Sequence, residues 1–162
     1  MPHVRRILVF VGVAVAVVGG GAGCGGGSRE RMEADTARFT WGQRTATVPL
    51  TDCGREGDVV VMAGAADGLV VQVGADLSEG GAARTGVTGD MGGDDGIWGA
   101  FGPELDQGPA GEITRVAADG DRLVVEGRWA RLDGDLRPEP GQPLLEGKLV
   151  ARCPEPVDDG AA

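Results

Sequence analysis

The sequence has very few of the side chains that most often carry acid–base or nucleophilic chemistry. His3 is the only histidine and Lys148 the only lysine among the 162 residues, and tyrosine is absent. Because His3 lies at the N-terminus, the rest of the chain offers no imidazole base, no Ser–His or Cys–His nucleophilic pair and no histidine-ligated zinc site. Any chemistry would rest on carboxylates or arginines. We therefore expect neither an enzyme nor a cofactor.

The sequence also lacks an apolar run long enough to cross a membrane. Ile7–Val18 supplies about a dozen apolar residues, where roughly 20 are needed to span a bilayer. A short apolar run that follows Arg5 and Arg6 is typical of a secretory signal. It leads to Gly21-Ala22-Gly23-Cys24, which resembles the bacterial lipoprotein signal. That motif implies that Cys24 receives diacylglycerol and becomes the new N-terminus, and Gly21 departs from the larger apolar residue that the motif prefers.

Cysteine is scarce, and its count agrees with this interpretation. In an exported protein, the three cysteines Cys24, Cys53 and Cys153 can form only one disulfide and would leave one thiol unpaired. Lipidation of Cys24 leaves Cys53 and Cys153 as an even pair in an oxidising compartment, where a disulfide persists. The bridge would close a loop of about 100 residues and stabilise the fold by up to about 4–5 kcal/mol. The alternative is ordinary secretion with cleavage near Ala22.

Basic residues are outnumbered by acidic ones. The chain has 15 Lys and Arg against 25 Asp and Glu, a formal net charge of −10. A strongly acidic protein repels phosphate backbones, so we expect no nucleic-acid partner. It also repels anionic lipid headgroups, so attachment to a membrane would come from the acyl chains on Cys24.

What the chain does have is a series of short, β-prone segments separated by turn residues. Roughly seven or eight such segments, with no convincing helix between them, predict an all-β fold, either a small antiparallel β-sandwich or a partly open barrel, with one disulfide. The inward-facing residues are expected to be Leu69, Val71 and Val73, then Leu123, Val125 and Trp129, and finally Leu145, Leu149, Ala151 and Cys153.

The connections between these segments can also be predicted. Asp67-Gly68 and Asp119-Gly120 each separate two apolar runs and indicate hairpins, and Asp67-Gly68 suits a type I′ turn. Pro49 indicates an edge strand or a bulge. The Gly- and Asp-rich segment 77–96 is expected to be a long loop. We divide the chain into a signal peptide (1–23), lipidated Cys24 with a flexible tether (24–37), a β domain (38–156) and a disordered tail (157–162).

Two groups of residues are candidates for binding. Asp90, Asp94 and Asp95 could bind calcium, which prefers oxygen ligands, but their spacing does not match an EF-hand and acidic loops are usually solvated. Trp98 and Trp129 could line an apolar or glycan pocket, although such residues more often belong to the core. We therefore predict no metal site and place both tryptophans in the core first.

The remaining charged residues suggest surface roles. Glu104 and Asp106 have no spacing that would make them a glycosidase pair. Four arginines should decorate the faces of the sheets and offset nearby acids: Arg115, Arg122, Arg128 and Arg131.

The overall layout resembles the LpqH-type lipoprotein antigens of mycobacteria and related actinobacteria. The shared plan is a lipoprotein signal, a tether and a small all-β domain with a first cysteine in Thr51-Asp52-Cys53 and a second in Leu149–Cys153. A Gly-rich stretch like Val59–Gly64 and a late strand like Asp121–Trp129 lie between them. The family's tethers are rich in Ser and Thr and glycosylated, whereas this tether is charged.

The resemblance implies a non-enzymatic protein that is displayed on the cell envelope. It would be anchored to the outer face of the cell membrane by diacylglyceryl and palmitate chains on Cys24, act as a monomer, and engage an unidentified envelope or host partner. The alternative is a carrier that holds a lipid or another small apolar molecule inside the domain. A filled interior would favour the first function and an open apolar cleft the second.

Overall fold

The computed structural model describes residues 35–153, and these form nine β-strands and two short 3₁₀ helices. The predicted signal peptide, Cys24, most of the tether and the predicted tail lie outside the described residues. The strands are β1 (Thr36–Trp41), β2 (Arg44–Glu56), β3 (Val59–Ala66), β4 (Leu69–Asp76), β5 (Gly86–Asp90), β6 (Ile97–Phe101), β7 (Glu112–Asp119), β8 (Arg122–Leu132) and β9 (Leu145–Arg152). The helices are η1 (Gly81–Arg84) and η2 (Gly93–Asp95).

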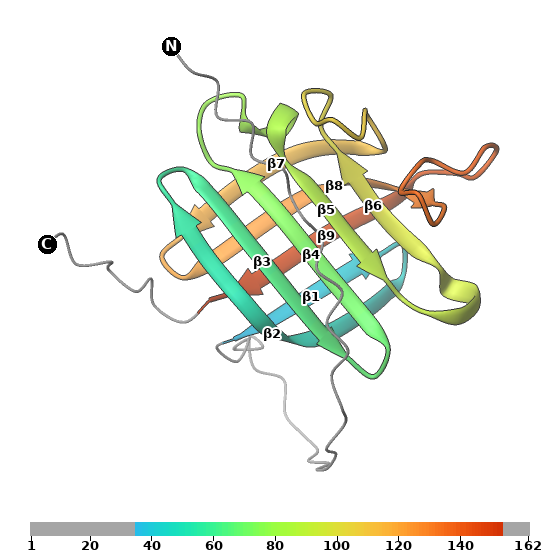
Figure 1. Cartoon of the computed structure of the whole chain (residues 1–162), viewed down its shortest axis with the longest axis horizontal. Coiled ribbons are helices and arrows are strands. Elements are labelled where there is room, and N and C mark those ends of the chain that lie inside the picture. Colours follow the sequence, from blue (N-terminus) through green and yellow to red (C-terminus); the bar gives the residue numbers. More distant parts are fainter. Residues whose placement is uncertain (1–34, 154–162) are drawn as a thin grey trace, which may run out of the picture.

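The strands form a closed antiparallel barrel with one additional strand. Their order is β6-β5-β4-β3-β2-β1-β9-β8-β7, and β6 also pairs with β8, which closes the barrel and leaves β7 outside the ring. In Figure 1, β3 to β6 cross the front while β1, β9 and β8 run behind them at a steep angle. The predicted all-β antiparallel fold is therefore confirmed in its barrel form.

Two strands bend and take part in both walls of this barrel. The first half of β2 pairs with β1 and the second half with β3, with a register shift between Leu50 and Asp52. This shift lies directly after Pro49, where the sequence predicts an edge strand or a bulge, and it corresponds to the bulge. The first part of β8 pairs with β7, and Ala130–Leu132 then pairs with β6. Bends of this kind allow an antiparallel sheet to turn the corners of an orthogonal barrel.

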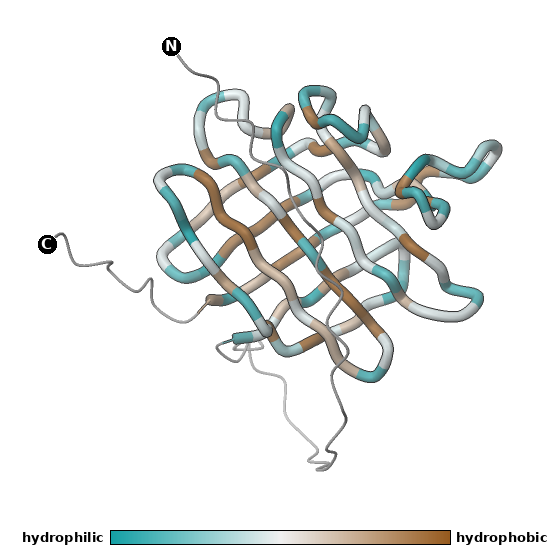
Figure 2. Tube along the Cα trace, in the orientation of Figure 1, coloured by the Kyte–Doolittle hydropathy of each residue, from teal (hydrophilic) through white to brown (hydrophobic). Residues whose placement is uncertain are grey.

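The hairpins follow the expected turn chemistry with one displacement. Asp67 and Gly68 have φ of 53° and 81°, as a type I′ turn requires. The second predicted turn was placed one residue too early, because Asp119 pairs with Arg122 and the loop is Gly120-Asp121. Hydrophilic residues gather at these turns and at the longer loops (Figure 2).

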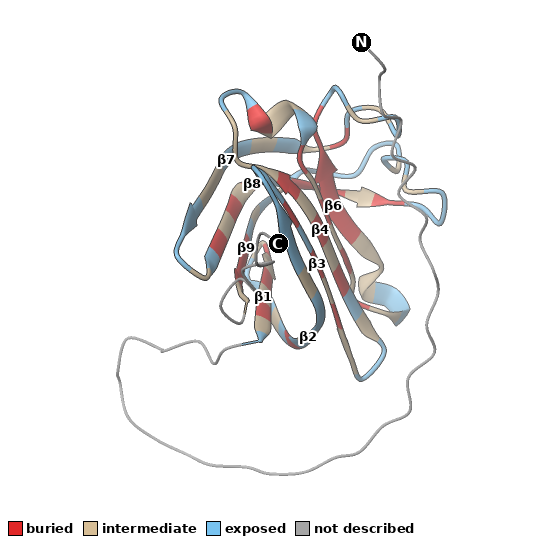
Figure 3. Ribbon diagram, turned by 60° about the vertical axis from the view of Figure 1, so that its left-hand side comes forward, coloured by how far each residue is buried: buried red, intermediate tan, exposed pale blue. Residues whose placement is uncertain are grey.

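The interior of the barrel is filled by large side chains from both walls. Phe39 lies 5.9 Å from Trp41 and 5.9 Å from Trp129, measured between ring centroids. Buried residues alternate with half-buried or exposed ones over most of β8 (Figure 3). The predicted inward residues of β4, β8 and β9 all face this core or pack against it. A smaller core outside the ring consists of Phe101, Ala110, Ala130 and Leu132.

The predicted disulfide is present and connects β2 to the end of β9. Cys53 on β2 is bonded to Cys153, which directly follows β9, and their Cα atoms are 6.0 Å apart. Both strands flank β1. The bridge therefore fastens the last strand to the second strand across the first.

Two expectations about segment boundaries were wrong. Segment 77–96 is not one long loop, because β5 occupies Gly86–Asp90 between η1 and η2. Its strand conformation comes from pairing with β4 on one side and β6 on the other. In addition, β1 begins at Thr36, inside the range that was predicted to be tether.

Candidate binding groove

A polar groove crosses the outer face of the wall formed by β7, β8, β9 and β1. Its volume is about 720 Å³. We call it the charged groove, and its lining residues are Thr40, Gly42, Glu112, Thr114, Glu126, Gly127, Arg128, Glu146, Gly147 and Lys148. Its size falls within the roughly 300–1,000 Å³ typical of ligand sites, although its lining is more polar than usual.

Two paired glycines form the floor of the charged groove. Gly127 on β8 pairs with Gly147 on β9. A Cβ atom built on Gly147 would overlap the indole ring of Trp129, and one on Gly127 would overlap the carbonyl oxygen of Glu112. The absence of side chains therefore leaves room for the Trp129 ring at Gly147 and for the β7 backbone at Gly127, and the charged side chains on either side form the walls of the groove.

The walls are two rows of charged side chains that run across the strands. The first row is Glu112, Arg128 and Glu146, from β7, β8 and β9. The second row is Arg115, Glu126 and Lys148, from the same strands. The sign of the charge alternates within each row and from one row to the next, so that every charged side chain has opposite charges beside it.

Ion pairs connect most of these side chains. Arg128 Nε donates to Glu112 Oε2 at 2.9 Å, and the two side chains form an ion pair. Lys148 Nζ donates to Glu126 Oε1 at 2.6 Å, and Arg115 lies 3.4 Å from the other oxygen of Glu126. These pairs bear out the expectation that arginines on this sheet offset nearby acids.

The pKa shifts at the charged groove follow from these contacts. The hydrogen bond from Lys148, with a smaller contribution from Arg115, lowers the pKa of Glu126. The hydrogen bond to Glu112 raises the pKa of Arg128, and the charge of Glu146 adds to this effect. Both shifts favour the charged forms of Glu126 and Arg128.

The two tryptophans proposed as pocket residues belong to the core. Trp98 is 7% exposed and Trp129 is fully buried, and both pack within the main cluster of the barrel. Trp129 Nε1 donates to the carbonyl oxygen of Thr40 at 2.8 Å, and Trp98 Nε1 donates to that of Asp95 at 2.7 Å. Their polar atoms are therefore used to join strands and loops.

The three aspartates considered for calcium are not brought together as a metal site. The carboxylate of Asp95 forms an ion pair with Arg44, and Asp90 Oδ1 accepts a hydrogen bond from the Gly92 amide at 2.9 Å. Asp94 accepts through its backbone carbonyl from Arg131 at 3.2 Å. Within residues 35–153, no group of three or more His, Cys, Asp or Glu side chains has an arrangement that could hold a metal ion.

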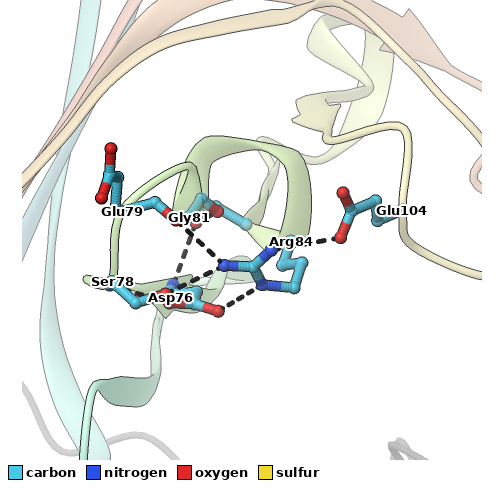
Figure 4. A network of polar contacts seen from close by, with 7 residues as sticks. Asp76, Ser78, Glu79, Gly81, Arg84 and Glu104 are labelled. Atoms are coloured by element: carbon cyan, nitrogen blue, oxygen red, sulfur yellow. Dashed lines mark hydrogen bonds and ion pairs between the residues drawn. The ribbon is translucent and has the colours of Figure 1, made fainter.

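A second polar cluster fastens the loop between β4 and β5 to the barrel (Figure 4). The Arg84 guanidinium contacts the Asp76 carboxylate at 2.6 Å and the Glu104 carboxylate at 3.2 Å, and it also donates to Ser78 Oγ at 2.9 Å. Hydrogen bonds from Ser78 and Arg84 lower the pKa of Asp76 to about 2. Because all these groups are partnered, the cluster is best explained as a latch that holds η1.

Sequence reasoning missed the charged groove although part of its signal was present. Glu126 and Arg128 alternate with the inward residues predicted around them, and Glu146 and Lys148 alternate in the same way. The missing information was the register across four strands, including a bulge on β7 between Ile113 and Arg115.

In the described part of the chain no helix is long and apolar enough to cross a membrane. A scan against protein-family models finds none that matches the chain, and no curated protein matches it.

Proposed function

We propose that the protein is an exported, lipid-anchored binding module of the cell envelope that acts without catalysis and engages a partner through the charged groove. The proposal joins the signal features at Ile7–Cys24 to the barrel that follows them. The plan is that of the LpqH-type lipoproteins, with the domain carried on the outer face of the membrane.

The disulfide supports export. Cys53 and Cys153 are bonded to one another, which leaves Cys24 as the odd cysteine. Disulfides persist in oxidising compartments and are rare in reducing ones. A lipid on Cys24 therefore accounts for the third cysteine without leaving a free thiol.

The filled interior supports binding at the outer surface and counts against the carrier. Phe39, Trp129 and Leu123 are at most 1% exposed, and the indole of Trp129 occupies the space above Gly147. An apolar ligand would have to displace these side chains. The filled interior is therefore the observation that favours the binding module over the carrier.

The ionisation of the carboxylates supports a role in binding. Asp76 and Glu126 have pKa values shifted downward by hydrogen bonds and ion pairs. A general acid at neutral pH needs a pKa that is raised toward 7. Lowered values are typical of carboxylates that hold structure or attract cations.

Lipid anchoring is tested by metabolic labelling of the full chain with a radioactive fatty acid in an actinobacterial host. We expect label in the wild-type protein and none in Cys24→Ser, with both proteins exported. Incorporation of labelled fatty acid into Cys24→Ser, or its absence from the wild-type protein, would contradict lipid anchoring at Cys24.

The carrier is tested by native mass spectrometry of the chain from Ser28 onward after purification from the same host. We expect the mass of the chain less two hydrogens, which corresponds to the disulfide and an empty interior. An additional mass that is released as a lipid on collisional activation would overturn the binding-module proposal in favour of transport.

A further inference from the structure

The charged groove has two poles of opposite sign. In the first row, Arg128 lies between Glu112 and Glu146, so the row has one carboxylate more than it has cations. Glu112 is paired with Arg128, whereas Glu146 is exposed and reaches Arg128 only through its charge. This row therefore retains the capacity to bind a cation.

The second row has the opposite arrangement of charges, with two cations and one carboxylate. Glu126 lies between Arg115 and Lys148, and both cations share its single carboxylate. Arg115 and Lys148 are largely exposed, with side-chain exposures of 62% and 47%. This row therefore retains the capacity to bind an anion.

The distance between the two poles is set by the strands. The rows lie two residues apart along β8 and β9, which corresponds to about 6.6–6.8 Å. Alternate side chains on one face of an extended peptide have the same spacing. On a peptide that runs parallel to β8 and β9, and so crosses the groove from one row to the other, a basic and an acidic side chain separated by one residue would therefore meet both poles at once.

We propose that the charged groove binds an extended peptide segment of a partner protein in which a basic and an acidic side chain stand two residues apart. The proposal rests on the binding role proposed above for this groove and names the chemistry of its partner. The net charge of the groove contributes little to binding, because the surplus negative charge of the first row cancels the surplus positive charge of the second. Recognition therefore depends on the order of charges in the peptide.

A glycan fits the charged groove less well than a peptide. Sugars are commonly held by aromatic rings, but Trp41, Trp98 and Trp129 are each at most 7% exposed. The lining residues that the groove offers are charged side chains, threonines and glycines. Charge complementarity is therefore the property that selects the occupant.

The test uses the purified full chain in detergent micelles and fluorescent peptides of equal length with serine and glycine spacers. The four peptides carry Lys-x-Glu, Glu-x-Lys, Lys-x-Lys or Glu-x-Glu, and binding is followed by anisotropy at low salt. We expect at least one of the two mixed peptides to bind at least tenfold more tightly than both like-charged peptides.

Three variants locate the binding. Glu146→Gln removes the surplus carboxylate of the first row and Lys148→Gln a surplus cation of the second, each at an exposed position. Each substitution should weaken binding of the mixed-charge peptide at least fivefold. Arg137→Gln, on the loop between β8 and β9, is the matched control and should bind like the wild type. Circular dichroism checks that all three variants fold.

Equal binding of mixed and like-charged peptides, or unchanged binding in both groove variants, would overturn the proposal. Neither result would affect the labelling of Cys24, which tests the anchored module separately. Conversely, failure of the labelling would leave the peptide measurements standing.

Discussion

Gly147 illustrates how one missing side chain determines both the core and the surface of the barrel. Trp129 is fully buried, and its indole lies where a Cβ on Gly147 would be placed. We expect Gly147→Ala to lower the free energy of unfolding by about 1–3 kcal/mol, because overpacking forces the ring and the backbone to shift. Guanidinium denaturation followed by tryptophan fluorescence measures this change.

Gly74 on β4 provides the matched control. A Cβ built there meets no atom within 4 Å, and its φ is not positive. Gly74→Ala should therefore be neutral or slightly stabilising, since alanine loses less backbone entropy on folding. Equal destabilisation by both substitutions would show that the contact with Trp129 is not the cause.

At the scale of elements, Arg84 decides whether η1 stays on the barrel. It contacts Asp76 at the end of β4 and Glu104 after β6. We expect Arg84→Ala to speed amide hydrogen exchange in segments 77–85 and 102–105 while exchange in β8 and β9 stays slow. Arg137→Ala, on an exposed loop, should leave all four segments unchanged. Slow exchange in 77–85 of Arg84→Ala would contradict the latch.

The same latch makes stability depend on pH in the acidic range. The pKa of Asp76 is lowered from 3.8 to about 2 in the folded protein, and its side chain is only 14% exposed. A lowered pKa contributes stability above the unfolded value, and this contribution is lost as the pH falls from about 4 toward 2. We expect a loss of about 2 kcal/mol over that interval.

Asp76→Asn isolates this contribution from those of other carboxylates. The variant should be less stable than the wild type at pH 6, and the difference should shrink toward pH 2. A difference between the two proteins that does not change with pH, measured by denaturation at each pH, would rule out titration of Asp76 as the source.

Most elements could be predicted because their signals are local. Alternating apolar residues identified the inward faces of β4 and β8, and Asp67-Gly68 identified a hairpin. β5 could not be predicted from Gly-Val-Thr-Gly-Asp, which has a single apolar side chain. The second of its two glycines, Gly89, is nevertheless required, since a Cβ there would lie 2.8 Å from the ring of Phe39 on the opposite wall.

At the scale of the whole molecule, closure of the barrel depends on contacts between distant residues. The disulfide joins positions separated by 100 residues. On the chain-entropy model such a loop stabilises the folded state by about 4–5 kcal/mol. We expect reduction, or the double substitution Cys53→Ser with Cys153→Ser, to lower the denaturation midpoint accordingly.

Equal midpoints with and without reducing agent would contradict this prediction, provided that mass spectrometry shows the thiols to be free. The bridge could be predicted from cysteine parity and strand phase. The closure of β6 on β8 and the charged groove could not, because both depend on the registers of strands far apart in the sequence.

The position of β1 has a mechanical consequence. This strand continues directly from the segment that leads to Cys24, and it lies between β2 and β9, antiparallel to both. A pull on the chain at Asp35 acts along the strand, so the hydrogen bonds on both edges are loaded together in shear instead of opening one after another. The bridge from Cys53 to Cys153 joins the two flanking strands to each other. A barrel held at its groove and pulled from its N-terminus would therefore resist force far better than its modest size suggests.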